Sequence, residues 1–239
     1  MSGHSKWSQI KRQKGANDAR RGALFTKVAR EISVAARAGG SDPDANFRLR
    51  LAIDKARSVN MPMDNIRRAI ERAAGAGEGE QLEEIVYEGY GPGGVANQVE
   101  AQSDNRNRTA AEIRAAFSKA GGQLASSGAV AWQFEPRGVI SILRAGADAD
   151  EVALAAIDAG AEDVDTDDPE RIEVYTGPAD LERVRRIIEE AGFSVESAET
   201  AMVARQTVAL ESDRARAALR LVEAHEDLDD VSRVSANFD

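Results

Sequence analysis

Apolar residues in the first third of the chain recur at the spacing of an α-helix. The first stripe repeats every fourth residue and consists of Leu24, Val28, Ile32 and Ala36. The second consists of Phe47, Leu51, Ala52 and Ala56. The third follows Pro62, which suits the first turn of a helix, and consists of Ile66, Ala69, Ile70 and Ala73. Glycines at 39–40, 75 and 77 end the first and third stripes, so the pattern predicts three short helices that form a bundle.

Beyond the glycine-rich segment 75–81, strand-like and helix-like stretches alternate. The residues from about 136 to 200 give the order β-α-β-β-α-β, which is typical of a ferredoxin-like fold. The predicted strands there lie at 139–143, 172–175 and near 164 and 195, with helices at 151–159 and around 181–188. Two further β-α-β segments, at 95–134 and 207–234, combine into a second such unit. Its predicted strands are 95–101, 130–134, 207–210 and 231–234, and its helices are 109–120 and 213–224.

The predicted fold class is therefore α+β, with an N-terminal three-helix domain followed by two ferredoxin-like α+β domains, one inserted in the other. The expected boundaries are 1–78 for a basic arm and helical bundle, 79–135 plus 201–239 for the split domain, and 136–200 for the inserted domain. Residues 1–21 are polar and basic with few apolar anchors, so we expect an arm that becomes ordered in part or only on binding.

Charge is distributed unevenly along the chain. The first 72 residues hold 16 lysines and arginines against seven acids, a balance of +9. The remaining 167 residues hold 15 basic and 34 acidic groups, a balance of −19, which gives the net charge of −10. Such polarisation indicates that one end of the molecule binds a polyanion while the rest repels it, and we interpret that polyanion as nucleic acid.

The candidate binding residues in the arm and first helix are mostly cations, which neutralise phosphates and release counter-ions. They are Lys6, Trp7, Lys11, Arg12, Lys14, Arg20, Arg21, Lys27 and Arg30. Trp7 adds a ring that can stack on an unpaired base. The alternative is a solvated basic terminus with no specific role. Trp7 weighs against it, because an exposed tail rarely keeps a tryptophan without a surface to pack on.

Two turns precede predicted helices. In the segment 39–46, Asp44 or Asn46 is expected to cap the second helix. In the segment 103–109, Arg106 and Arg108 flank a helix start, and Thr109-Ala-Ala-Glu112 has the spacing of a capping box. A helix N-terminus attracts anions, so these two arginines are candidates for a second phosphate contact. The alternative is an Asn/Asp turn with exposed arginines.

The segment Gly89-Tyr-Gly-Pro-Gly-Gly94 matches the G-x-G-x-x-G pattern of dinucleotide-binding proteins. That site needs a helix directly after the loop, whereas a strand is predicted from Val95. We therefore reject the dinucleotide site. What remains is a loop between two strands, whose glycines allow another backbone to approach closely: Gly89, Gly91, Gly93 and Gly94.

The chain offers little for catalysis or metal binding. It has no cysteine and two histidines, and no Ser-His-Asp set, P-loop or metal-ligand cluster is visible. The acidic run 163–168 lacks the glycine and terminal glutamate of an EF-hand. We expect no catalytic residues, no metal, no cofactor and no enzymatic activity. No apolar run reaches the roughly 20 residues of a membrane span and no secretory signal is visible, so we expect a cytoplasmic protein without a membrane partner.

Several motifs resemble those of the YebC/PmpR family, which includes the mitochondrial translational activator of cytochrome c oxidase subunit one. They are Gly3-His-Ser-Lys-Trp7, the segments 39–46 and 48–56, Tyr87-Glu-Gly-Tyr-Gly-Pro-Gly-Gly94, Ser103-Asp-Asn-Arg-Asn-Arg-Thr109 and Gly138-Val-Ile140. The resemblance implies a helical N-terminal domain, two α+β domains and a non-enzymatic cytoplasmic regulator of gene expression. It also implies a link to ribosomes and to relief of stalling at proline-rich stretches. One departure is the segment 202–205, where the family pattern has proline after two apolar residues.

Two functions remain open at this point. The favoured one is a translation factor that binds rRNA of the large ribosomal subunit. The rival is a transcriptional regulator that binds duplex DNA, which requires a helix in the major groove and usually a dimer. No helix-turn-helix spacing is evident in 24–73 and no coiled-coil stripe indicates dimerisation, so we rank DNA second and expect a monomer.

Overall fold

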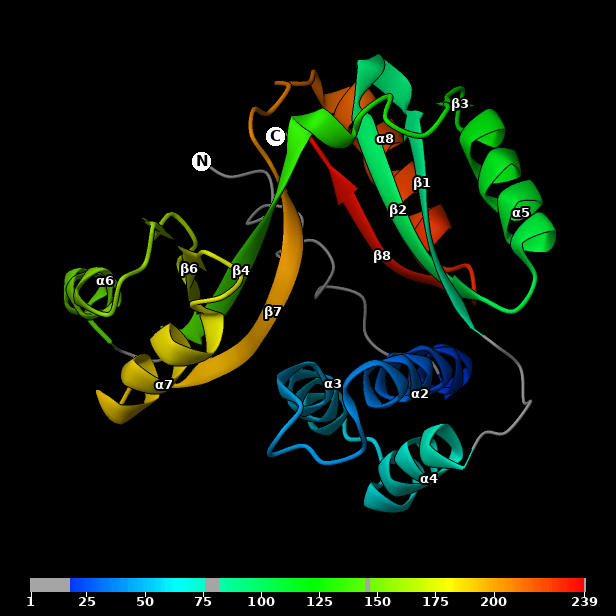
Figure 1. Cartoon of the computed structure of the whole chain (residues 1–239). Coiled ribbons are helices and arrows are strands. Elements are labelled where there is room, and N and C mark those ends of the chain that lie inside the picture. Colours follow the sequence, from blue (N-terminus) through cyan, green and yellow to red (C-terminus); the bar gives the residue numbers. More distant parts are fainter. Residues whose placement is uncertain (1–17, 76–81, 145–146, 239) are drawn as a thin grey trace. The chain divides into compact units, whose positions relative to one another are not determined.

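The computed structural model describes residues 18–75, 82–144 and 147–238 (Figure 1). These residues form seven α-helices and two four-stranded antiparallel sheets, so the predicted α+β class is confirmed. The described chain divides into two compact units. One consists of Glu135–Val203, and the other contains the N-terminal helices, the residues up to Phe134 and the residues from Ala204 onward.

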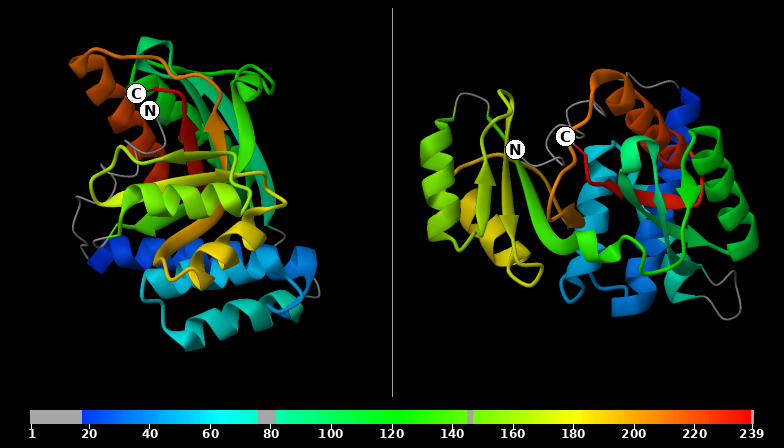
Figure 2. Two further views of the ribbon diagram at one scale, coloured as in Figure 1. Left: turned by 90° about the vertical axis from the view of Figure 1, so that its left-hand side faces the viewer. Right: turned by 90° about the horizontal axis from the view of Figure 1, so that it is seen from above.

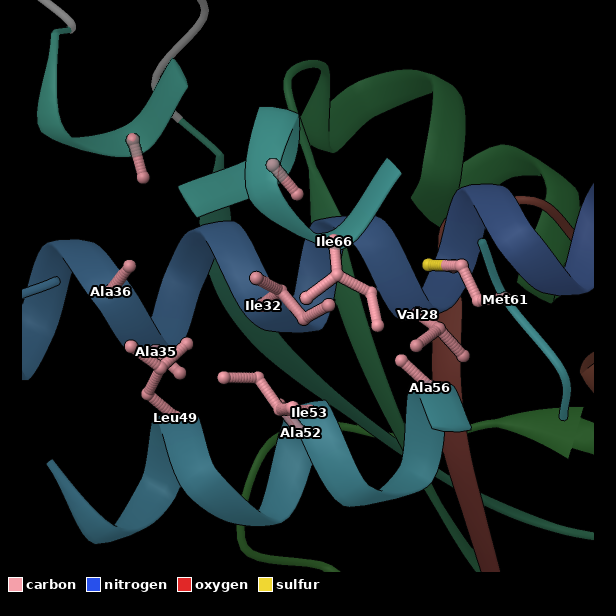
Figure 3. Close-up of a cluster of buried hydrophobic side chains, with 12 residues drawn as sticks. Val28, Ile32, Ala35, Ala36, Leu49, Ala52, Ile53, Ala56, Met61 and Ile66 are labelled. Atoms are coloured by element: carbon pink, nitrogen blue, oxygen red, sulfur yellow. The ribbon is translucent and has the colours of Figure 1, made fainter. Parts of the chain in front are cut away.

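The N-terminal helices are α2 (Asp18–Gly39), α3 (Phe47–Ser58) and α4 (Met63–Ala74), as the apolar stripes predicted. Their shared core consists of buried aliphatic side chains (Figure 3): Val28, Ile32, Ala35, Leu49, Ile53, Ala56, Met61, Ile66 and Ala69. The buried face of α3 differs from the prediction. Leu49 and Ile53 are buried, whereas Phe47 and Leu51 are only partly buried. The guanidinium of Arg50 lies over the Phe47 ring, 5.7 Å from its centroid, on this less buried side of the helix.

Polar side chains fix the helices of the bundle to one another. Asn46 caps α3, since its side-chain oxygen accepts the Leu49 N–H at 3.0 Å. The amide nitrogen of Asn46 donates to the carbonyls of Ala35 and Gly40, at 2.8 and 2.7 Å, and so ties the end of α2 to the start of α3. Of the two candidate caps, the structure selects Asn46. Asn46 is favoured because its side-chain amide also donates to carbonyls at the C-terminus of α2, which lack partners within their own helix.

The sheet of the split unit has the strand order β3-β1-β2-β8. The strands are β1 (Glu83–Tyr90), β2 (Ala96–Ser103), β3 (Gln123–Leu124) and β8 (Val231–Ala236). Strands β1 and β2 form a hairpin across the glycine loop, and β8 pairs with the other edge of β2. Helices α5 (Arg106–Lys119) and α8 (Ser212–Glu226) pack against this sheet and against each other. Numbered along this unit, the strand order is 3-1-2-4, with β1 joined through the hairpin to β2. The elements therefore run β-β-α-β-α-β along the chain, rather than in the ferredoxin-like order β-α-β-β-α-β.

Two predicted strands of this unit are wrong. Residues Ala131–Gln133 form a short 3-10 helix, and the next strand starts only at Phe134. Segment 207–210 contributes a single bridge between Val208 and Phe238. The buried carboxylate of Glu88 explains the first error. It accepts the N–H groups of Gly128, Val130 and Ala131 at 2.7–2.8 Å and so curls a segment whose apolar residues resemble a strand.

The inserted unit has the predicted order β-α-β-β-α-β. Its elements are β4 (Phe134–Leu143), α6 (Ala149–Asp158), β5 (Asp163–Asp165), β6 (Arg171–Thr176), α7 (Leu181–Glu190) and β7 (Val195–Ala204). The strand order β5-β6-β4-β7 is ferredoxin-like. Helices α6 and α7 pack against each other and against the sheet (Figure 2). Its core includes Ile140, Val152, Val174, Leu181 and Ile188, all fully buried.

Candidate nucleic-acid interface

The predicted interface begins in the N-terminal arm, most of which lies outside the described residues. This applies to Lys6, Trp7, Lys11, Arg12 and Lys14. Arg20 and Arg21 belong to the first turn of α2, and their side chains also lie outside the described part of the chain. The described part of the interface therefore starts at Lys27 and Arg30.

Lys27 and Arg30 extend from α2 to the segment that joins α8 to β8. The Lys27 ammonium donates to the backbone carbonyl of Glu226. The Arg30 guanidinium donates to the carbonyl of Asp229 and to the Asp230 carboxylate, both at 2.8 Å. Two of the predicted phosphate ligands thus already bind oxygen atoms of their own chain.

Asp230 is the centre of a buried polar network. Its side chain is 3% exposed and accepts from the guanidinium of Arg108 at 2.6 Å and from the hydroxyls of Thr109 and Ser103 at 2.7 and 3.1 Å. Arg30 binds its second oxygen. Burial by itself raises the pKa of this carboxyl, but the donors, Arg108 first among them, outweigh burial and hold the pKa below its usual range. Asp230 is therefore an ionised carboxylate inside the fold.

The start of α5 differs from the predicted capping box. Asn105 is the cap, and its side chain accepts the Arg108 N–H at 3.1 Å, while Thr109 lies a full turn inside the helix and is buried. The Arg108 guanidinium lies between the carboxylates of Asp104 and Asp230, which raise its pKa. The backbone carbonyl of Arg106 accepts from a tyrosine hydroxyl, and the Arg106 side chain is exposed.

The glycine loop approaches side chains of its own unit. A Cβ at Gly89 would lie 2.5 Å from the Phe117 ring of α5, and one at Gly91 would lie 2.8 Å from a leucine of α8. Gly93 and Gly94 have positive φ angles of 78° and 79°, which glycine adopts without strain. Packing against α5 and α8 therefore accounts for Gly89 and Gly91, and backbone conformation for Gly93 and Gly94.

Four other cations of the bundle pair with carboxylates. These pairs are Arg48 with Glu84, Lys55 with Glu31, Arg57 with Asp54, and Arg67 with Asp64 and Glu71. Arg68 and Arg72 of α4 differ, because neither has a hydrogen-bond or ion-pair partner among the described residues. Both side chains are exposed.

A groove with a volume of about 940 Å³ lies between α2 and α4. Arg30 and Arg37 of α2 and Arg68 and Arg72 of α4 are among its lining residues. Sequence reasoning missed the last three. A signal was present, since positions seven apart in α2 and four apart in α4 share a helix face. What the sequence did not show is that α2 packs against α4 and brings the two pairs to one groove.

His225 is a buried titratable group outside this interface. Its ring is fully buried in α8 and meets the Phe117 ring edge-on, with 4.4 Å between centroids. Burial lowers the pKa of His225 to about 4, and the backbone of Ile113 offsets only part of this shift. The ring is therefore neutral at physiological pH and serves as a core side chain.

Within the described ranges, no group of histidine, aspartate and glutamate side chains is arranged to hold a metal ion. No helix described by the structure is both long and apolar enough to cross a bilayer.

Comparison with known proteins identifies the family. Residues 5–76 match the TACO1/YebC protein N-terminal domain, and residues 82–238 match the TACO1/YebC second and third domain. The chain belongs to the TACO1/YebC family. The resemblance seen in the sequence motifs is thereby confirmed.

Members of the TACO1/YebC family resemble the chain over its whole length. A relative from Dehalococcoides mccartyi is 54% identical over 239 residues, covering 100% of this chain and 95% of the relative. Another from Roseiflexus castenholzii is 55% identical over 244 residues, with the same coverage. Both are named "probable transcriptional regulatory protein". The crystal structure of a conserved hypothetical protein from Aquifex aeolicus is similar with a TM-score of 0.90 and 46% identity, covering 98% of this chain and 96% of that one.

Proposed function

We propose that the protein is a nucleic-acid-binding regulator of gene expression that binds its ligand through the N-terminal arm and helical bundle. The observation that carries this proposal is the charge balance, +9 over the first 72 residues and −19 over the rest. A cationic domain gains affinity from counter-ion release when it binds phosphates. The acidic remainder repels polyanions and so confines binding to one end of the molecule. The names of the relatives support a regulatory role.

As its ligand we propose rRNA of the large ribosomal subunit. Duplex DNA is usually read by a helix that projects into the major groove. The arginines of α2 and α4 instead line a recess between two helices, which suits a strand or loop of RNA better than a duplex. The protein then acts by occupying a site on the ribosome, without making or breaking a bond. The second candidate, a transcriptional regulator bound to duplex DNA, is favoured by the names of the relatives.

Two measurements at the same physiological salt concentration test this proposal. We expect the protein to cosediment with 70S ribosomes and to bind a duplex DNA library only weakly in a gel-shift assay. Tight, sequence-specific binding to duplex DNA without cosedimentation would favour the second candidate. Failure to bind either ligand would refute nucleic-acid binding altogether.

The role of the arm is tested by a variant that combines Lys11→Glu, Lys14→Glu, Arg20→Glu and Arg21→Glu. We expect it to lose cosedimentation, because four cations that neutralise phosphates become anions. Circular dichroism and thermal melting establish that the variant is folded. Cosedimentation equal to that of the wild type would exclude the arm from the interface.

A further inference from the structure

We propose that the groove between α2 and α4 binds the phosphate backbone of a single-stranded RNA segment, through Arg37, Arg68 and Arg72 with Arg30 beside them. This inference rests on the proposed function and assigns a site to it. It also moves the centre of the interface away from the predicted contact at Arg106 and Arg108, toward residues that sequence reasoning missed.

The two arginines of α4 are placed in a way that is unfavourable for the isolated protein. Arg68 and Arg72 lie one helical turn apart, and like charges at this spacing repel each other. The two acids of α4, Asp64 and Glu71, pair with Arg67 instead. Within the described structure the helix thus directs its own carboxylates to one arginine and leaves two arginines at the groove with none. An anion bound in the groove removes this repulsion.

The lining of the groove includes small as well as charged side chains. Ala29, Ser33 and Ala69 line it with small side chains. The Ser33 hydroxyl donates to the Ala69 carbonyl at 3.1 Å and holds α2 close to α4. Axes of packed helices lie about 8–10 Å apart, so a recess between two of them is narrow enough for a single strand, whereas a duplex rests on its rim.

Asp104 and Arg30, two other charged residues at the groove, have partners within the described chain. Among the lining residues that the structure describes, Asp104 is the one acid, and its carboxylate pairs with Arg108 at 2.8 Å. Arg30 is held by Asp230 through a single nitrogen, Nη1, which also donates to a carbonyl. An arginine has five N–H donors, so Arg30 keeps donors for a phosphate while the carboxylate fixes its position.

The test compares two charge-reversal variants of the full chain. In R68E/R72E both α4 arginines at the groove are reversed. In the control, R114E/K119E, two exposed cations on α5 are reversed, which gives the same change in net charge. Neither control residue lines the groove. The probe is a short fluorescein-labelled poly(U) strand, measured by fluorescence anisotropy over a series of salt concentrations. A duplex DNA of similar length serves as the second probe.

We expect R68E/R72E to bind poly(U) at least about tenfold more weakly than the wild type. The slope of log K against log salt should decrease by about 1.4, since each lost phosphate contact on a single strand contributes about 0.7. The control should bind poly(U) within about twofold of the wild type once the non-specific effect of its changed net charge is subtracted. The salt dependence of the control itself measures that non-specific effect. R68A/R72A should also bind poly(U) more weakly than the wild type and the control do. Its melting temperature should be no lower than that of the wild type, and this result would establish that binding is not lost through unfolding.

Each contrary result has a distinct meaning. If the wild type binds poly(U) and R68E/R72E binds it equally well, the groove is not the site, although the proposed function stands. An equal loss in the control and in R68E/R72E also overturns the assignment. Duplex DNA bound more tightly than poly(U), with the loss confined to the duplex, overturns the single-stranded ligand. If wild-type protein binds neither the probes nor ribosomes, the proposed function itself fails.

Discussion

Asp230 offers the sharpest test of how the bundle is joined to the sheet that carries β8. Its carboxylate accepts hydrogen bonds from the guanidinium groups of Arg30 and Arg108 and from two hydroxyls, and only 3% of the Asp230 side chain is exposed. Asp230→Asn keeps the shape, removes the charge and places an N–H₂ group where one oxygen accepted. Loss of one partner from a buried pair costs about 3–5 kcal/mol. Because the Arg30 and Arg108 side chains are 26% and 43% exposed and regain water, we expect the lower end, about 3 kcal/mol.

Urea unfolding followed by circular dichroism measures this cost. The neighbouring exposed residue supplies the control: Asp229→Asn should change the free energy of unfolding by less than about 0.5 kcal/mol. A double-mutant cycle of Asp230→Asn with Arg108→Ala should give a coupling energy of about 1–2 kcal/mol. A loss below about 0.5 kcal/mol for Asp230→Asn, or additive effects in the cycle, would refute the idea that this network stabilises the fold.

Two further predictions concern the contact between α5, α8 and the glycine loop. The pKa of His225 is about 4 in the folded state and about 6.5 in the unfolded state. Between these two pH values the unfolded state therefore binds a proton that the folded state does not. Stability should therefore fall by about 3 kcal/mol as pH is lowered from 7 to 4, and His225→Phe should remove that part of the pH dependence; an unchanged profile would contradict the burial argument. Gly89→Ala places a methyl group 2.5 Å from the Phe117 ring and should cost about 1–3 kcal/mol in thermal or urea unfolding, whereas a neutral result would show that the loop can move.

The helices and the inserted ferredoxin-like unit were predictable because their signals are local. Apolar spacing and a following glycine defined α2 and α4 within one or two residues of their ends at Gly39 and Ala74. The face of α3 was not predictable, because Ala52 and Ala56 are compatible with two neighbouring apolar faces, and only packing selects the one that contains Ile53. The turn at Ala131–Gln133 depends on a carboxylate 43 residues away, which no local window contains.

The same distinction applies to the interface. The charge balance is a sum over residues, and the sequence states it directly. Whether a given arginine is available for a phosphate depends on its neighbours in space. Arg30 meets a carboxylate 200 residues away, and Arg108 meets the same one 122 residues away. Arg68 has acids at the correct helical spacing, yet those acids pair with another arginine. Which carboxylate pairs with which arginine follows only from the three-dimensional positions of the side chains.

The segment 103–109 shows what this means for electrostatic reasoning. Arginines, hydroxyls and a helix start were expected to attract an anion there, and an anion is present, but it is the carboxylate of Asp230 from the chain itself. That carboxylate also holds Arg30, which lines the groove between α2 and α4. The network therefore fixes one wall of the groove rather than competing with it for ligand. Asp230→Asn should consequently weaken poly(U) binding through the position of Arg30, and Arg30→Ala in that background should add little further loss. If the effects of the two substitutions on poly(U) binding were fully additive, this result would refute the idea that Asp230 positions Arg30 in the groove.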